Sequence, residues 1–116
     1  DFGGFEAAKQ QGFKVLSVDV NHCKEAPGLI IDGTLKRVDT VIGLSVAKIE
    51  AGESSFVGSY GLAEGGMGAE ALLPDDELAA SGCLIAGMPD VVTKVRALAK
   101  QIEDGSLKVA DPLAAN

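Results

Sequence analysis

The sequence predicts an α/β fold in which a mainly parallel sheet carries helices on both faces. Short apolar runs alternate with longer segments of helical periodicity, and this alternation is typical of βαβ units. The stretch FKVLSVDV, residues 13–20, is mostly apolar, as are the strands of parallel sheets that are covered on both faces. Glycines also follow the helical segments where helices commonly end.

The first half of the chain is expected to contain two helices and two strands. In chain order these are a short helix that follows a Gly-rich loop and ends at Gly12, a strand over 13–20, a polar connection over 21–28, a strand over 29–32, and a helix over 35–51. The helix over 35–51 has the clearest apolar repeat at i, i+3 and i+4 spacing. Thr34 or Asp32 is expected to cap its start and Gly52 its end.

The second half is expected to contain two β segments and a long helix. In chain order these elements are two β segments within 54–73 around a turn at 64–66, a short helix or loop over 74–81, a helix from Pro89 to Gly105, and a terminal strand or extended tail over 107–112. Proline is favoured in the first turn of a helix, and glycine is favoured just after its end. The last helix is therefore marked at both ends.

Composition excludes several classes of protein. The chain has 116 residues, a length typical of one domain, and a net charge of −7. This acidic balance argues against a nucleic-acid partner, because nucleic-acid surfaces need a basic patch. The sequence contains no apolar run near the roughly 18 residues of a membrane helix.

Cysteine and histidine provide no metal motif. Cys23 and Cys83 are compatible with one disulfide or with two free thiols. Because cysteine is among the most often buried residue types, two buried free thiols are the favoured interpretation. His22 is the only histidine, and the three or four ligands of a metal site cannot be assembled around it. Neither a metal nor a cofactor is predicted.

Enzyme motifs are not found either. Ser54 and Ser55 have no neighbouring base pattern, so nucleophilic catalysis has no support. The run EGGMG lacks the Lys-Ser/Thr pair of a phosphate-binding loop and is better interpreted as a hairpin turn. The chain is therefore not expected to be an enzyme.

Two charged residues are candidates for a binding site. Asp19 stands near the C-terminal end of strand 13–20, and ligands of open α/β sheets bind at such strand ends. Its carboxylate can accept two hydrogen bonds from a vicinal diol, but it can equally cap a turn or pair with a cation. Lys36 falls in the first turn of the predicted helix, where the helix dipole disfavours a cation by about 0.3–1 kcal/mol.

The position of Lys36 therefore needs an explanation. One alternative is local: Lys36 and Asp39 form an i, i+3 ion pair. The other is functional: the ammonium reaches back over the helix start into a cleft near Asp19. Arg37 is interpreted as a solvated surface charge.

The chain contains, in this order, the stretches GFEAAKQQGFKVLSVDVN, DGTLKRVDTVI, AKIEAG, YGLAEGGMG and KQIEDGSLKV. Together they resemble the basic membrane protein family, whose members are nucleoside-binding lipoproteins of the type I periplasmic-binding fold that feed bacterial ABC importers. The resemblance covers essentially the whole chain in the order of the family. LKRVD is its most specific part, and the Gly-rich YGLAEGGMG supports it.

The resemblance implies a longer protein with two α/β lobes that close on a purine nucleoside. Residues 1–116 would be its C-terminal portion, with the first lobe segment and the start of the second lobe upstream. Asp19 matches the residue that binds the ribose hydroxyls, Lys36 matches a lysine that reaches the ligand, and Gly3 belongs to a Gly-rich loop used at the ligand. The chain departs from the family pattern at Asn21 and His22, where a second Asp and a Gln are usual, and at 32–34, where a Ser-rich stretch is common.

The function implied is that of the substrate-binding component of an ABC importer. Its partners would be a nucleoside-like small molecule and the membrane permease, without nucleic acid. A lipid anchor on the missing N-terminus would hold the protein at the periplasmic or cell-surface side of the membrane. Two alternatives remain open: a ligand-sensing regulatory module of the same fold that takes no part in transport, and a fragment of an α/β enzyme.

Overall fold

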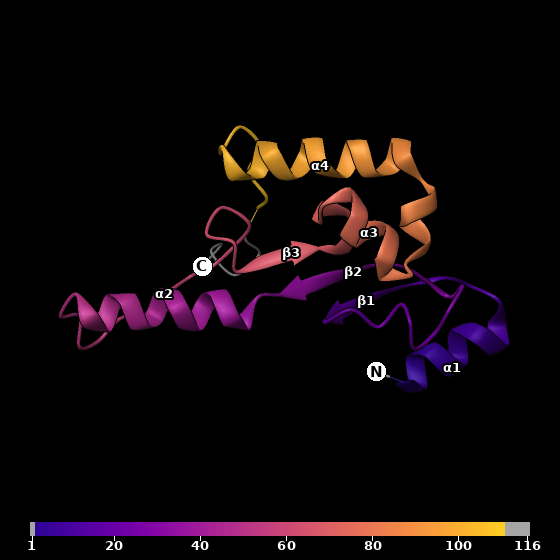
Figure 1. Cartoon of the computed structure of the whole chain (residues 1–116), viewed down its shortest axis with the longest axis horizontal. Helices are drawn as coiled ribbons and strands as arrows, with labels where there is room; N and C mark the ends of the chain where they lie inside the picture. The colour runs from indigo at the N-terminus through magenta and orange to yellow at the C-terminus, as the bar shows by residue number, and fades with distance from the viewer. Residues whose placement is uncertain (1, 111–116) are drawn as a thin grey trace.

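The computed structural model describes residues 2–110 and has a mixed α/β architecture (Figure 1). The α/β class predicted from the sequence is therefore confirmed. In chain order the elements are α1 (Phe2–Gln11), β1 (Val15–Asp19), β2 (Ile30–Lys36), α2 (Val38–Glu50), β3 (Met67–Ala69), the 3-10 helix η1 (Glu70–Leu72), α3 (Asp75–Ser81), the 3-10 helix η2 (Leu84–Gly87) and α4 (Pro89–Glu103).

Three strands form one sheet in the order β1-β2-β3. β1 and β2 run parallel, and Ser17 lies opposite Gly33. β2 and β3 run antiparallel, and Leu35 lies opposite Gly68. Gly33 permits the close approach of β1, because a Cβ atom at this position would collide with the Ser17 side chain. The sheet is thus mixed, and the expected mainly parallel pairing is observed only between β1 and β2.

Helices lie on both sides of the sheet, with α3 and α4 on one side and α1 on the other (Figure 1). The core brings together the connection after β1, the start of β2 and the C-terminal helices. Its buried members are Cys23, Ile30, Ala71, Leu78, Cys83, Ile85 and Val92.

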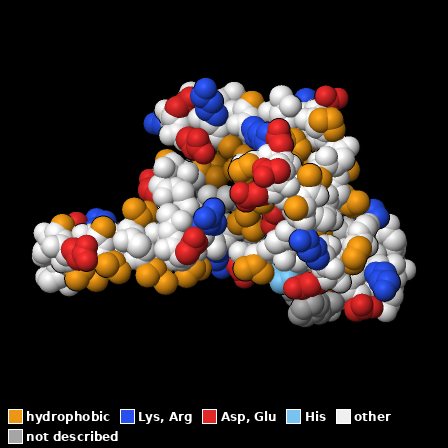
Figure 2. Space-filling view, viewed as in Figure 1, with side chains coloured by type: hydrophobic (Ala, Val, Ile, Leu, Met, Phe, Trp, Pro, Cys, Tyr) orange, Lys and Arg blue, Asp and Glu red, His pale blue; other side chains and the backbone are white. Residues whose placement is uncertain are grey.

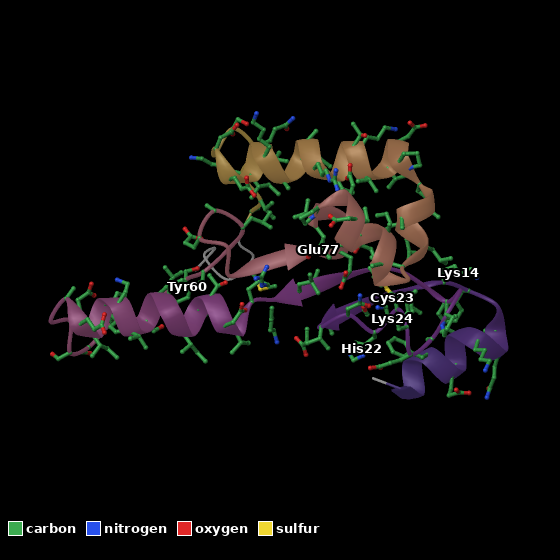
Figure 3. All side chains as sticks on the ribbon, in the orientation of Figure 1. Lys14, His22, Cys23, Lys24, Tyr60 and Glu77 are labelled. Atoms are coloured by element: carbon green, nitrogen blue, oxygen red, sulfur yellow. A yellow bond between two sulfur atoms is a disulfide. The ribbon has the colours of Figure 1, made fainter. Side chains whose placement is uncertain are left out.

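A disulfide joins Cys23 to Cys83 inside this core (Figure 3). The prediction of two free thiols is therefore wrong, although both cysteines are buried as expected. The two residues are 60 positions apart, and only the packing of the β1–β2 connection against the segment after α3 brings them together. Local spacing contains no signal for such a contact.

α2 extends away from the sheet (Figure 1). None of its residues is buried, although its apolar repeat predicts a helix packed against a core. The radius of gyration is 16.6 Å, compared with about 13 Å for a compact domain of this length. Figure 2 shows hydrophobic side chains gathered along the projecting helix. Its exposed apolar residues are Val38, Ile42, Leu44, Val46 and Ile49.

β1 is also less covered than its composition predicts. Leu16 and Val18 are 69% and 58% exposed, whereas Ser17 between them is buried, so the face of β1 that carries Leu16 and Val18 is largely uncovered. Buried parallel strands normally have neighbours on both edges and both faces. The exposed apolar side chains of β1 and α2 are the kind of surface that other protein segments cover.

Several predicted boundaries need correction. The strand expected over 29–32 extends to Lys36, and the helix expected from residue 35 begins at Val38. Neither Thr34 nor Asp32 caps it: Arg37 occupies the N-cap position, and no side chain supplies a cap hydrogen bond. Of the two β segments expected within 54–73, only β3 forms.

Other boundaries agree with the sequence. Residues 75–81 form α3, and Pro89 opens α4 as its first residue. Gly12, Gly52 and Gly105 follow their helices with positive φ, as expected for glycines that end helices. Residues 107–110 contain no strand, and the remainder of the tail predicted over 107–112 lies outside the described residues.

Candidate functional site

The carboxyl ends of β1 and β2 meet at one edge of the sheet, because the two strands are parallel and in register there. Asp19 pairs with Leu35 in this register, so Lys36 follows one position later. Lys36 Nζ lies 2.6 Å from Asp19 Oδ1. The structure thus brings together the two charged residues that the sequence singles out, at the strand ends where α/β sheets bind ligands.

Lys36 occupies a different position from the one predicted. It is the last residue of β2 rather than part of the first turn of α2, so the helix-dipole argument does not apply to it. The local alternative, an ion pair of Lys36 with Asp39, is not observed. Arg37 makes that contact, with Nη2 3.3 Å from Asp39 Oδ2, and Lys36 is directed to Asp19 instead.

Asp19 has an unusual backbone conformation. Its φ is +78°, and among the described residues it is the one non-glycine residue with positive φ. An L-residue in this left-handed region is strained, although aspartate tolerates it better than most. Backbone strain of this kind is commonly found at functional positions. Glycine would adopt this conformation with less strain, but the sequence has an aspartate here, whose carboxylate lies at the carboxyl end of β1.

Lys36 keeps Asp19 negatively charged. A hydrogen bond from Lys36 and then its positive charge lower the pKa of the Asp19 carboxyl below its ordinary value of 3.8. A lowered pKa gives a stabilisation that is present above the ordinary pKa and is lost as the pH falls through the folded-state pKa. The side chains of Lys36 and Asp19 are 59% and 54% exposed, so solvent screens the pair and its contribution to stability is small. Both groups remain accessible to a ligand.

Gly3 is not in the loop that the resemblance implies. α1 begins at Phe2, so Gly3 lies in the first turn of a helix, and the expectation of a Gly-rich loop before that helix is wrong for the described residues. The role of Gly3 at a ligand remains a prediction.

The connection after β1 is held by local polar contacts. His22 Nδ1 lies 2.7 Å from Glu25 Oε2, and the His22 ring makes an edge contact with Phe5. The Asn21 amide donates to the Ser81 carbonyl oxygen. Among residues 2–110, no group of three or more His, Cys, Asp or Glu side chains could hold a metal ion. Asn21 and His22, at which the chain differs from the family that it resembles, therefore have structural contacts.

A hollow beside Lys36 was not predicted from the sequence. It has a volume of about 260 Å³ and is lined by Lys36 and Arg37, by apolar side chains of α2, and by Tyr60 and Met67. Figure 3 shows Tyr60 beside α2. The sequence places Tyr60 in one of the two β segments expected within 54–73. Residues 53–66 instead follow an irregular path, and no periodic pattern in the sequence indicates such a path.

Replacing Asp19 with glycine is expected to leave the unliganded protein at least as stable as the wild type. Glycine relieves the left-handed conformation and thereby lowers the unfolding equilibrium constant by about two- to fivefold. The lost ion pair offsets little of this gain, because it is exposed. Urea unfolding of the unliganded protein measures the effect. Asp19→Asn is the control, because it removes the charge but keeps a side chain that tolerates positive φ. A clear loss of stability in Asp19→Gly alone would show that the site is not strained.

Comparison with known proteins leaves the family open. No protein-family model matches the chain, and neither the curated proteins nor the solved structures give a significant match. In the part of the chain that the structure describes, no helix combines the length and apolar character needed to cross a bilayer.

Proposed function

We propose that this chain is the C-terminal part of a solute-binding protein that delivers a purine nucleoside, or a related solute, to a bacterial ABC importer. The observation that carries the proposal is the Asp19–Lys36 pair at the carboxyl ends of two parallel strands. The motifs GFKVLSVDVN and LKRVD, which contain these two residues, support the same assignment through their resemblance to the basic membrane protein family.

Asp19 is suited to bind a vicinal diol. Lys36 approaches Oδ1, which leaves Oδ2 and the remaining lone pair of Oδ1 available to the ribose 2′- and 3′-hydroxyls. Hydrogen bonds to a charged acceptor are stronger than those between neutral groups. Lys36 offsets the charge of the carboxylate as water leaves the site and can donate to the same ligand. The chain would bind its ligand rather than transform it.

A second lobe would complete the site. In the proposed two-lobed type I fold, the Asp19–Lys36 pair lies on one wall of a cleft and the opposite wall comes from the other lobe. The half-exposed state of both side chains supports this arrangement, because an open cleft leaves one wall in water. Contacts made only in the closed state would shift the population towards the form that the permease recognises.

The disulfide supports a location outside the cytosol. Disulfides persist in oxidising compartments and are rare where thiols are kept reduced. Cys23 and Cys83 form such a bridge in the core. In the proposal the intact protein is periplasmic or exposed at the cell surface, and a lipid anchor upstream of this sequence holds it near the permease.

Calorimetry with purine nucleosides on the full-length protein tests the proposal. Asp19→Ala and Lys36→Gln are each expected to weaken binding by about tenfold, because each removes from the protein a charged group that would form a hydrogen bond with the ligand. Arg37→Gln is the matched control: it removes a neighbouring cation that pairs with Asp39 and should change the affinity less than twofold. Unchanged affinity in both Asp19→Ala and Lys36→Gln would remove this pair from the binding site.

Sugar selectivity provides a separate test of the diol contact. A 2′-deoxynucleoside lacks one of the two hydroxyls that would donate hydrogen bonds to Asp19. One acceptor position of the carboxylate is then left without a partner in the closed cleft. We expect the deoxynucleoside to bind about tenfold more weakly than the ribonucleoside. The difference should disappear in Asp19→Ala. Equal binding of both sugars by the wild type would contradict the proposed geometry.

A further inference from the structure

Glu70 has an ionisable side chain, and it is among the most deeply buried residues of the described chain. It opens η1, directly after Ala69 ends β3, and it is 1% exposed. η1 packs against β2 on one side and against α3 and α4 on the others. The Glu70 side chain is therefore enclosed where the edge of the sheet meets the C-terminal helices.

This buried carboxyl has no hydrogen-bond partner among residues 2–110. Neither Oε1 nor Oε2 is bonded to any group of the described chain. A buried carboxylate without a partner is strongly destabilising, and such a group usually takes up a proton instead of remaining charged. The surroundings of Glu70 therefore favour its neutral form.

A second carboxyl, that of Asp32, makes the ionisation of Glu70 still harder. Asp32 on β2 is 8% exposed, and its Oδ1 accepts a hydrogen bond from the backbone N–H of Gly33. Burial first, and then the charge of Asp32, raise the pKa of the Glu70 carboxyl above its ordinary value of 4.5. The Glu70 carboxyl is thus stabilised as the neutral acid.

No cation on the surrounding elements neutralises Glu70. On α4, Arg96 directs its guanidinium to the carbonyl oxygens of Ala71 and Leu73 and to the Asp75 carboxylate. On β2, Lys36 is paired with Asp19. The other charged residues of α3 and α4 are exposed, and β3 and η2 contain none. These exposed residues are Asp75, Asp76, Glu77, Asp90, Lys94, Lys100 and Glu103.

We propose that Glu70 is a proton-binding site, and that its proton keeps β3 and η1 docked between β2 and α4. With the proton bound, the side chain is a neutral group in an enclosed apolar setting. When the proton leaves, two negative charges, Glu70 and Asp32, stand close together inside the protein. The docking of β3 and η1 then weakens, so these elements respond to pH independently of any ligand at Asp19.

The expected pH dependence follows from the raised pKa. The stabilisation that the Glu70 proton supplies is complete below the ordinary pKa of 4.5 and is lost as the pH rises through the folded-state pKa. The carboxyls of Asp19, Asp39 and Asp104 have lowered pKa values and act in the opposite direction. A comparison with a variant of Glu70 alone separates the two effects.

The test is urea unfolding between pH 4 and pH 8 of the wild type, Glu70→Gln and Glu70→Met. Both replacements are uncharged at every pH. At pH 8 we expect each to lower the unfolding equilibrium constant roughly tenfold relative to the wild type, equivalent to about 1.4 kcal/mol, with a smaller difference at pH 4. Hydrogen exchange at pH 8 should show stronger protection of residues 67–72 in both variants. Glu77→Gln, at an exposed position on α3, is the matched control and should follow the wild type.

Two results would overturn the proposal. A wild type and a Glu70→Gln variant with parallel pH profiles would show that Glu70 does not bind a proton in this range. A loss of stability at pH 8 in both Glu70→Gln and Glu70→Met would show that the folded protein uses the charged carboxylate. Both replacements are neutral, but they differ in polarity. A packing defect in one of them would lower its stability, whereas the expected result is higher stability of both variants at pH 8.

Discussion

Removing the Cys23–Cys83 disulfide is expected to lower the free energy of unfolding by about 4 kcal/mol. The two cysteines are 60 positions apart, so the bridge closes a long loop in the unfolded chain. In the chain-entropy account, the stabilisation rises from about 3 kcal/mol for a 15-residue loop to about 4.7 kcal/mol for a 100-residue loop. Urea unfolding of Cys23→Ala/Cys83→Ala and of the reduced wild type measures the loss.

The reduced wild type isolates the effect of the bond itself, and its difference from the alanine variant measures the effect of the buried sulfur atoms. Cys23 and Cys83 are 1% and 4% exposed, so the alanine variant also loses the buried sulfur atoms, whereas reduction retains them. Both forms should nevertheless lose most of the 4 kcal/mol, because both release the same loop. If the native protein releases two reactive thiols in denaturant without reductant, the bridge is absent from the protein. If neither form is destabilised, the bridge does not constrain the unfolded chain.

The elements with local signals were predicted well. α4 begins at Pro89 and ends two residues before Gly105, because a proline at the start, an apolar stripe and a final glycine all lie within one continuous segment. β1 (Val15–Asp19) lies within the strand predicted over 13–20, because the apolar run of that stretch is followed by polar residues from Asn21 onward. In these cases the neighbours in the sequence supply the physical cause.

The boundary between β2 and α2 shows where local reasoning fails. Leu35 has the spacing of the apolar residues of α2, and the sequence therefore assigns it to that helix. In the structure it pairs with Asp19 of β1 and with Gly68 of β3. Pairing with a strand more than 30 positions away extends β2 and moves Lys36 out of the helix. The Asp19–Lys36 pair was predicted, but the reason given for it, a cation misplaced in a helix, was wrong.

The buried polar groups were not predicted. Glu70 and Asp32 come close only because η1 folds against β2, and Arg96 meets Ala71 across the contact between α4 and η1. In the sequence Glu70 falls within the second of the two β segments expected over 54–73, and nothing marks it as buried. Its burial depends on the placement of α3 and α4 over the sheet, which no local pattern specifies.

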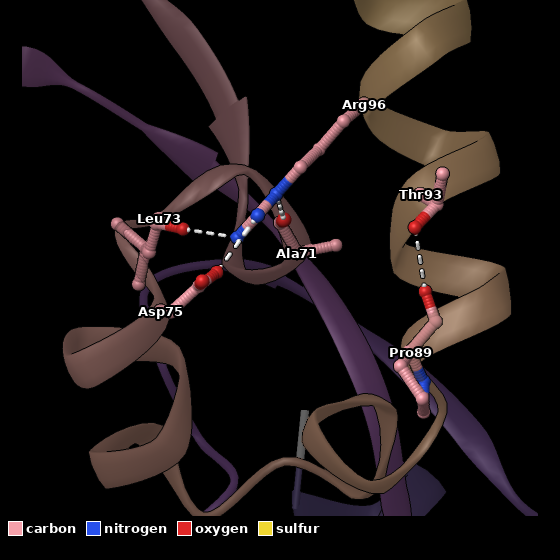
Figure 4. Close-up of polar contacts among 6 residues, drawn as sticks. All are labelled: Ala71, Leu73, Asp75, Pro89, Thr93 and Arg96. Atoms are coloured by element: carbon pink, nitrogen blue, oxygen red, sulfur yellow. Dashed lines mark hydrogen bonds and ion pairs between the residues drawn. The ribbon is translucent and has the colours of Figure 1, made fainter.

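Among the polar residues of α4, Arg96 is the one whose replacement should lower the free energy of unfolding most. Its Nε donates to the carbonyl oxygen of Ala71 at 2.9 Å, and its Nη2 donates to that of Leu73 at 2.7 Å (Figure 4). Its Nη1 lies 2.8 Å from Asp75 Oδ1. The guanidinium thus satisfies the two carbonyl groups at which the chain leaves η1 and turns into α3, and it holds α4 against this turn.

We expect Arg96→Met to lower the free energy of unfolding by about 3 kcal/mol, because each buried acceptor left without a donor costs about 1–3 kcal/mol. Ala71 is fully buried, so its carbonyl has the poorest access to replacement water. Asp75 contributes little, because its side chain is 89% exposed. Methionine retains much of the apolar stem of arginine, so the measured loss reports the hydrogen bonds more than the packing.

Two further variants determine which property of Arg96 matters. Arg96→Lys keeps the charge but replaces the planar fork with a single ammonium, which can reach one of the two carbonyl groups at a time. It should recover less than half of the loss. Lys94→Met removes an exposed cation from the same helix and should leave stability within about 0.5 kcal/mol of the wild type. If Arg96→Lys restored full stability, positive charge beside Asp75 would be sufficient. If Arg96→Met were no worse than Lys94→Met, water would be replacing the guanidinium at both carbonyl groups, and α4 would be held by its apolar face alone.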